Sequence, residues 1–119
     1  WLGTDNGMVC QPNMFEELQA AWQCVRRQDP RAGSEEARAL LQAATLWPLK
    51  HLKKGYRGIE KEGEASFMII ARGSNLQFLT DLHAGLVNRA RVENLVGLVV
   101  KGKVFYYEKP KKKPKIFEK

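Results

Sequence analysis

Apolar residues in the first half of the chain recur at the spacing of an α-helix. Five of them lie three or four positions apart and share one face: Met14, Leu18, Ala21, Trp22 and Val25. Asn13 precedes this stripe as a candidate N-cap, and Glu16 stands where a capping box needs a carboxylate. Asp29 and Pro30 interrupt the pattern. We therefore predict a helix over residues 14–28.

Two further helices are predicted before the pattern changes. Ser34 is the expected N-cap of a helix over residues 35–46, which carries a stripe of alanine and leucine. Pro48 suits the first turn of a short third helix over residues 48–54, because a helix leaves its first N–H groups unpaired in any case. The first half of the chain is thus expected to be helical.

The second half is expected to be mostly extended. An apolar run over residues 67–71 predicts a buried strand, and a short helix is expected within residues 79–90. Residues 95–100 and 103–107 flank Gly102 and predict a two-stranded hairpin. Helices followed by strands indicate the α+β class, and this order is unusual for a self-contained small domain.

Composition and charge add a basic tail to this picture. Apolar residues make up 44% and charged residues 28%, which is ordinary for a globular protein. No apolar run approaches the roughly 20 residues that span a bilayer. The net charge is +7, but residues 101–119 hold eight lysines and two glutamates, so the other hundred residues carry only +1. We interpret residues 109–119 as a solubilising basic tail; a tail of this kind can also attract nucleic acid.

Asp5 is the first candidate for chemistry. Trp1 and Leu2 are interpreted as the end of an apolar strand, and Asp5 follows in a turn rich in glycine. Barrel enzymes place catalytic groups at such strand ends. An aspartate in a turn can equally cap the turn through its own side chain. The local pattern leaves both interpretations open.

Downstream segments add a resemblance to the amidohydrolase superfamily, in its cytosine-deaminase-like and chlorohydrolase-like branch. Leu2–Asn6, followed by the helix opening at Met14, resembles the motif of the eighth barrel strand of that family. Three later segments are similar to family motifs in the order that the family requires: Leu40–Thr45, Gly58–Ala65 and the closing hairpin Val99–Val104. The likeness covers residues 1 to about 107.

This resemblance implies an arrangement of domains. Residues 1–56 would be the last part of a (β/α)8 barrel, with the end of strand eight and the three helices. Residues 57–108 would be part of a small β-domain, and residues 109–119 the tail. An intact barrel takes roughly 250 residues. We therefore expect the chain to be a fragment of a longer enzyme and to lack an N-terminal part.

The resemblance also implies a site. Asp5 would contact a divalent metal, zinc or iron, and accept a proton from the water that the metal activates. The substrate would be a small molecule, presumed cyclic, with a C–N or related bond to be hydrolysed; Asn6 is the candidate that would contact it. The family turn often runs Gly-Lys-x-Ala-Asp, whereas here Gly63 is followed by Glu64, Ala65, Ser66 and Phe67, which puts the subfamily in doubt.

The other metal ligands of the family belong to strands that this sequence does not contain. Its two histidines, His51 and His83, fall in no matching motif and are interpreted as ordinary surface or half-buried residues. Trp22 and Trp47 lie on apolar stripes and are interpreted as core. Since a catalytic zinc site needs about three protein ligands, we expect the isolated chain to be inactive and to hold no metal.

Expectations about partners follow from the same pattern. Strands that have lost their neighbours expose edges, so we expect self-association, and we expect no membrane contact. Cys10 and Cys24 form no ligand-like pair, which suggests a reduced cytoplasmic setting. Two alternatives remain beside the enzyme fragment: a small basic-tailed module that binds nucleic acid, which we favour less, and a structural chain that pairs with another protein.

Overall fold

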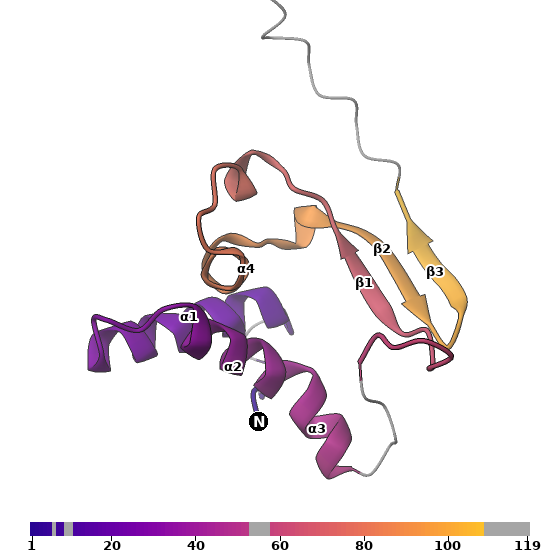
Figure 1. Cartoon of the computed structure of the whole chain (residues 1–119), viewed down its shortest axis with the longest axis horizontal. Coiled ribbons are helices and arrows are strands. Elements are labelled where there is room, and N and C mark those ends of the chain that lie inside the picture. The colour runs from indigo at the N-terminus through magenta and orange to yellow at the C-terminus, as the bar shows by residue number, and fades with distance from the viewer. Residues whose placement is uncertain (6, 9–10, 53–57, 109–119) are drawn as a thin grey trace, which may run out of the picture.

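The computed structural model describes residues 1–5, 7–8, 11–52 and 58–108. The described chain is an α+β fold in which helices precede a three-stranded antiparallel sheet (Figure 1). No barrel is present in this part of the chain. The α-helices and strands are α1 (Met14–Gln28), α2 (Ser34–Ala44), α3 (Leu46–His51), β1 (Phe67–Ile70), α4 (Leu82–Arg89), β2 (Leu95–Val100) and β3 (Lys103–Tyr107).

Helix α1 has the predicted bounds and the predicted cap. The Asn13 side-chain oxygen accepts a hydrogen bond from the backbone N–H of Phe15 at 3.1 Å, which satisfies one of the free donors at the helix start. Glu16 differs from the expected capping box, because its carboxylate accepts from the side-chain amide of Asn13 at 2.8 Å. The cap is therefore confirmed, with a different role for Glu16.

Helices α2 and α3 differ from the prediction, and α2 covers Ser34–Ala44 in place of 35–46. The N-cap of α2 is Gly33, and its N–H donates to the Glu36 carboxylate at 2.7 Å. Ser34 is already helical, and its hydroxyl donates to Asp81 at 3.1 Å. Helix α3 covers Leu46–His51 in place of 48–54; residues 53 and 54 lie outside the described part. The prediction of Ser34 as the cap was wrong because a distant partner binds its side chain.

Residues 1–5 form no strand, which corrects the prediction of a strand end at Trp1 and Leu2. A β-strand forms when its backbone hydrogen-bonds to another strand. Within the described chain, the backbone of this segment hydrogen-bonds to a helix. The backbone N–H of Leu2 donates to the carbonyl oxygen of Ala43 at 3.1 Å, near the end of α2. The segment is thus tied to the helical layer, and no sheet continues from it.

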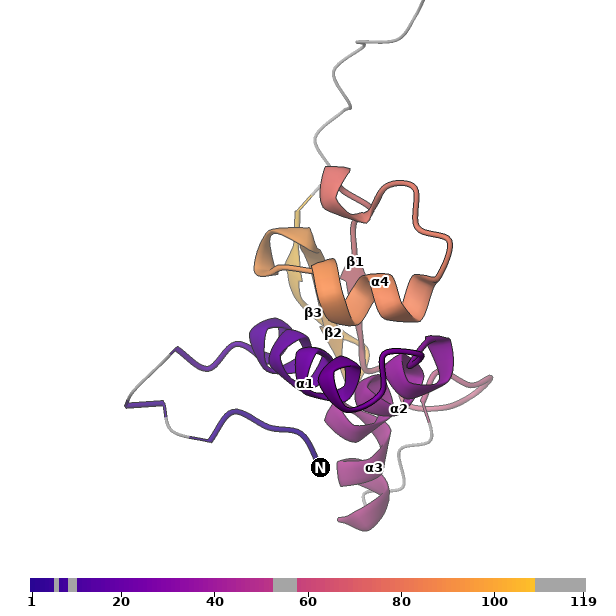
Figure 2. The same cartoon turned by 90° about the vertical axis from the view of Figure 1, so that its left-hand side faces the viewer.

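The core lies among the helices. Helices α1, α2 and α4 pack on one another, with α4 lying across the other two (Figure 2). The buried cluster consists of Leu18, Trp22, Ala32, Ala37 and Val87. Trp22 is 7% exposed and confirms its predicted place in the core, whereas Trp47 is 46% exposed, which makes that prediction wrong. Helix α3 has six residues, none of them buried.

The sheet has the order β1-β2-β3, with both pairs antiparallel. The hairpin has the predicted bounds, and its turn places Lys101 at φ 49° and Gly102 at φ 75°. Gly97 of β2 is opposite Ile69, whose side chain would be only 3.0 Å from an added Cβ. Every residue of β3 is exposed. The sheet therefore offers two open edges and much uncovered apolar surface.

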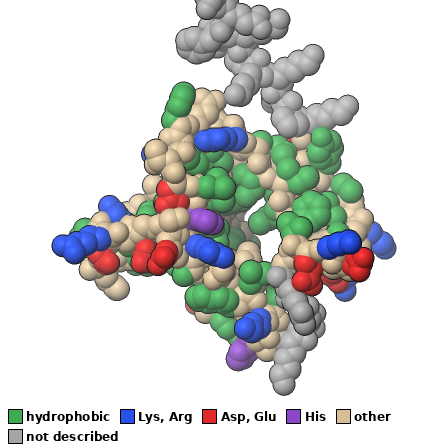
Figure 3. All heavy atoms as spheres, in the orientation of Figure 1, with side chains coloured by type: hydrophobic (Ala, Val, Ile, Leu, Met, Phe, Trp, Pro, Cys, Tyr) green, Lys and Arg blue, Asp and Glu red, His purple; other side chains and the backbone are tan. Residues whose placement is uncertain are grey.

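The segment from the end of α4 to β2 joins the helical layer to the sheet and buries Ala90, Asn94 and Val96. Asn94 lies between α4 and β2, immediately before β2 begins. It is 5% exposed and is the one polar or charged residue that is buried in the described chain. Its side-chain amide donates to the carbonyl of Ala71 at 3.2 Å and to the side chain of Asn75 at 2.9 Å. Within the described part of the chain, no substantial packing joins an α-helix to a strand. Figure 3 shows hydrophobic side chains around a hollow between the two layers.

Candidate functional site

Asp5 lies in the extended N-terminal segment and is exposed. The backbone bond from Leu2 to Ala43 fixes the start of this segment against α2. No hydrogen bond or ion pair engages the Asp5 carboxylate within the described chain. The carboxylate is therefore available as a ligand or a proton acceptor. Asn6 and Cys10, the two neighbouring candidates from the sequence, lie outside the described residues.

The two histidines are not gathered around Asp5. His51 ends α3, and its ring meets that of Trp1 edge to face at a centroid distance of 4.8 Å. His83 lies in α4, with its Nδ1 3.1 Å from the hydroxyl of Ser34. Cys24 is a free, exposed thiol on α1. Across residues 1–5, 7–8, 11–52 and 58–108, no three histidine, cysteine or acidic side chains come together as a metal site.

Among the residues that the structure describes, two titratable groups have shifted pKa values, and both shifts have local causes at the surface. The backbone N–H of Gly33 lowers the pKa of Glu36 below its ordinary value of 4.5, because the hydrogen bond favours the charged carboxylate. The hydroxyl of Tyr106 donates to Glu108 at 2.7 Å, which raises the pKa of this phenol above its ordinary value of 10.0. Neither shift involves Asp5.

A shallow aromatic hollow lies near the N-terminal segment. Trp1, Trp47, Lys50 and His51 line a volume of about 630 Å³. The exposed indole of Trp47 stands here and not in the core. Helix α3 is too short to bury a face against the rest of the fold, so its apolar and aromatic side chains remain at the surface.

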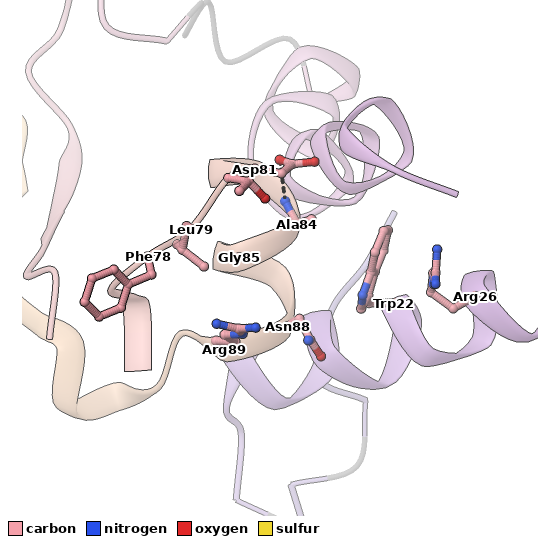
Figure 4. A pocket seen from close by; sticks show the side chains of 10 residues that line it. Trp22, Arg26, Phe78, Leu79, Asp81, Ala84, Gly85, Asn88 and Arg89 are labelled. Carbon is pink, nitrogen blue, oxygen red and sulfur yellow. Dashed lines mark hydrogen bonds between the residues drawn. The ribbon is translucent and has the colours of Figure 1, made fainter. Parts of the chain in front are cut away.

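A second pocket joins α1 to the segment that leads into α4 (Figure 4). Its volume is about 290 Å³, and Trp22 and Arg26 of α1 face Phe78, Asn88 and Arg89 across it. Sequence reasoning missed this pocket, because it assigned Trp22 only to the core. No local pattern links α1 to residues 78–89, so only the tertiary packing brings these side chains together.

None of the described helices is long and apolar enough to cross a bilayer; α1, the longest, has 15 residues. No family model matches the chain, and no curated protein or solved structure matches it either.

Proposed function

We propose that this chain is the C-terminal part of a metal-dependent amidohydrolase that hydrolyses a C–N or related bond of a small molecule. The support begins with the order of motifs around Asp5, Leu40–Thr45, Gly58–Ala65 and Val99–Val104. Helix α1 follows the Asp5 turn and β2–β3 form a hairpin, as the resemblance implies. The chain itself would be inactive, because it supplies one ligand of a site that needs about three.

The open sheet is the structural observation that carries this proposal. Strands β1 and β3 each leave one edge unpaired, and no helix packs substantially on the strands in the described chain. A sheet with an uncovered apolar face needs a further layer to bury that face. An open sheet of this kind is consistent with part of a small β-domain whose further strands would come from another part of the same enzyme.

Asp5 would act as a metal contact and a proton acceptor. Its exposed, unengaged carboxylate fits one oxygen ligand of zinc or iron, but the described residues do not fit a complete metal site. When bound, the metal would supply Lewis acidity to water. A carboxylate within hydrogen-bond reach of that water can accept its proton. The remaining ligands would come from the part of the enzyme that precedes Trp1.

Metal content and turnover of the complete gene product test the proposal. The product that continues upstream of Trp1 should contain stoichiometric zinc or iron and hydrolyse members of a panel of cyclic amides and aminated heterocycles. Asp5→Asn should lower that turnover by about 100-fold or more, since it removes a general base. Glu93→Gln, which neutralises an exposed acid before β2, should leave turnover unchanged. Normal turnover in Asp5→Asn would overturn the assignment.

Single-stranded nucleic acid is a second candidate ligand, favoured by one observation. The three aromatic residues Phe105, Tyr106 and Tyr107 are exposed on β3, immediately before the lysine-rich tail. Exposed aromatic rings beside basic residues can stack bases while the charges attract the backbone. Binding of an oligonucleotide should then weaken steeply with added salt and fall in Phe105→Ala. Absence of binding at low salt would remove this candidate.

A further inference from the structure

The pocket between α1 and residues 78–89 carries two arginines without an acidic partner. Arg26 of α1 and Arg89 of α4 are both exposed, and neither forms an ion pair within the described chain. The guanidinium of Arg26 is nevertheless held in place, since Nη1 donates to the carbonyl of Ala32 at 2.8 Å. Its remaining N–H groups are free to bind an acceptor in the pocket.

The acidic residue in the pocket is already engaged. The carboxylate of Asp81 caps α4 by accepting from the N–H of Ala84 at 3.1 Å, and it also accepts from the hydroxyl of Ser34 at 3.1 Å. No ion pair joins Asp81 to either arginine in the described chain, and with its carboxylate counted the lining has a net charge of +1. This balance favours an anion over a cation.

Two aromatic rings accompany these charges. The indole of Trp22 on α1 is largely buried, at 7% exposure, and the guanidinium carbon of Arg26 lies 6.0 Å from the centre of that ring. Phe78 is 93% exposed and has φ 54°, in the left-handed region that a bulky side chain rarely adopts. Strained backbone of this kind is often found at ligand sites. Figure 4 shows Phe78 and Trp22 on opposite sides of α4, so the exposed aromatic ring that the pocket offers is that of Phe78.

Asn88 supplies a polar group between the two arginines (Figure 4). Its side-chain oxygen accepts from Gln23 at 3.4 Å, and its backbone carbonyl accepts from Gln19 at 3.1 Å. These bonds to α1 hold Asn88 in position and leave its side-chain NH2 as a donor. The pocket lining thus combines hydrogen-bond donors on Arg26, Asn88 and Arg89 with the exposed aromatic ring of Phe78.

We propose that this pocket binds a small aromatic carboxylate. A guanidinium pairs with a carboxylate through two parallel N–H···O bonds, and a ligand ring would lie against the exposed ring of Phe78. The volume of about 290 Å³ is at the lower end of ligand sites and suits a molecule built on one ring. Asp5 does not line the pocket, so this binding site goes beyond the proposed hydrolase chemistry.

Titration of the 119-residue chain with benzoate tests the proposal, with benzamide as the uncharged probe of the same shape. In two-dimensional NMR, benzoate up to about 10 mM should shift the indole N–H signal of Trp22, assigned with Trp22→Phe, and the amide signals of residues 78–89. Benzamide should shift them far less. Equal responses to both probes, or no response to benzoate, would overturn the proposal.

Matched arginine variants locate the binding. Arg89→Gln removes a side chain with no bond to the described fold and should weaken benzoate binding by about tenfold. Arg26→Gln should weaken it similarly, and its folding can be checked from the dispersion of the amide spectrum. Arg27→Gln removes the same charge from the same helix outside the pocket and should have little effect. An equal loss in Arg27→Gln would mean that binding reflects net charge alone.

Discussion

Gly85 of α4 packs so closely against the side chain of Leu79 that a methyl group at this position would clash with it. A Cβ at this position would lie 2.4 Å from Leu79 Cδ1 and 2.9 Å from Leu79 Cγ. Gly85 is buried in the interior of α4, so the glycine weakens the helix itself. The glycine therefore lowers the helix propensity of α4, while the side chain of Leu79 occupies the space that the methyl group of an alanine would need.

We predict that Gly85→Ala lowers the free energy of unfolding by about 1 kcal/mol. Overpacking against Leu79 costs about 1–3 kcal/mol, and alanine recovers about 1 kcal/mol of helix propensity. Urea denaturation followed by far-UV circular dichroism measures the difference. In a Leu79→Ala background the clash is absent, so the same Gly85→Ala change should become stabilising. A destabilisation of the same size in both backgrounds would contradict this explanation.

Single residues also show where sequence reasoning succeeded and failed. Asn13 caps α1 as predicted, because its partners are its immediate neighbours in sequence. Ser34 was predicted to cap α2, but Asp81 binds its hydroxyl from far along the chain, and Gly33 takes the cap. Asp5 was identified from its local pattern and its resemblance, and the structure places it at the surface without gathering the two histidines around it.

At the scale of elements, α2 depends on charge at its first turn. The N–H of Gly33 lowers the pKa of Glu36, so ionised Glu36 stabilises the folded helix start. A lowered folded pKa means that this contribution is present above the ordinary value of 4.5 and is lost as the pH falls through the folded value.

We predict that Glu36→Gln lowers the melting temperature at neutral pH and that the difference from the unchanged chain shrinks below pH 4.5. Thermal melts at a series of pH values measure this difference. Glu35→Gln is the matched control, because Glu35 is exposed in the same turn and accepts no hydrogen bond within the described chain. If Glu35→Gln and Glu36→Gln follow the same pH dependence, the bond to Gly33 is not its cause.

Elements with strong local signals were predicted with their observed bounds. Helix α1 has a long apolar stripe and a cap, and the β2–β3 hairpin has Gly102 at a turn that needs positive φ. Helix α3 begins two residues before the predicted start, since its short apolar pattern does not fix where the turn after α2 ends. The predicted end of β1 was one residue late, although the N–H of Ala71 still donates to the carbonyl of Asn94 at 2.7 Å.

At the scale of the molecule, the open sheet predicts self-association. Strand β3 has an unpaired edge and exposes apolar or aromatic side chains along most of its length. Exposed edges of this composition pair with other chains. Multi-angle light scattering over a wide concentration range should therefore show a mass that rises with concentration. A single monomer mass throughout would contradict the prediction.

Phe105→Lys should reduce this association, because a lysine on an edge strand opposes pairing. The side chain is 66% exposed, so its replacement should cost little stability. Phe78→Lys makes the same change at an exposed site away from the sheet and should leave association unchanged.

The position of the sheet beside the helices could not be predicted from the sequence, since no local sequence pattern indicates which helices and strands pack together.

The small junction around Asn94, which joins the helices to the sheet, affects how each part of the molecule unfolds locally. Units that share little buried surface exchange their amide hydrogens independently, each with its own free energy of opening. The amides of α1, α2 and α4 should therefore exchange as one slow group, and those of β3 as a much faster one. A carboxylate bound between α1 and α4 would slow exchange in the first group and leave the second as it was, so occupancy of the pocket would not be transmitted to the hairpin.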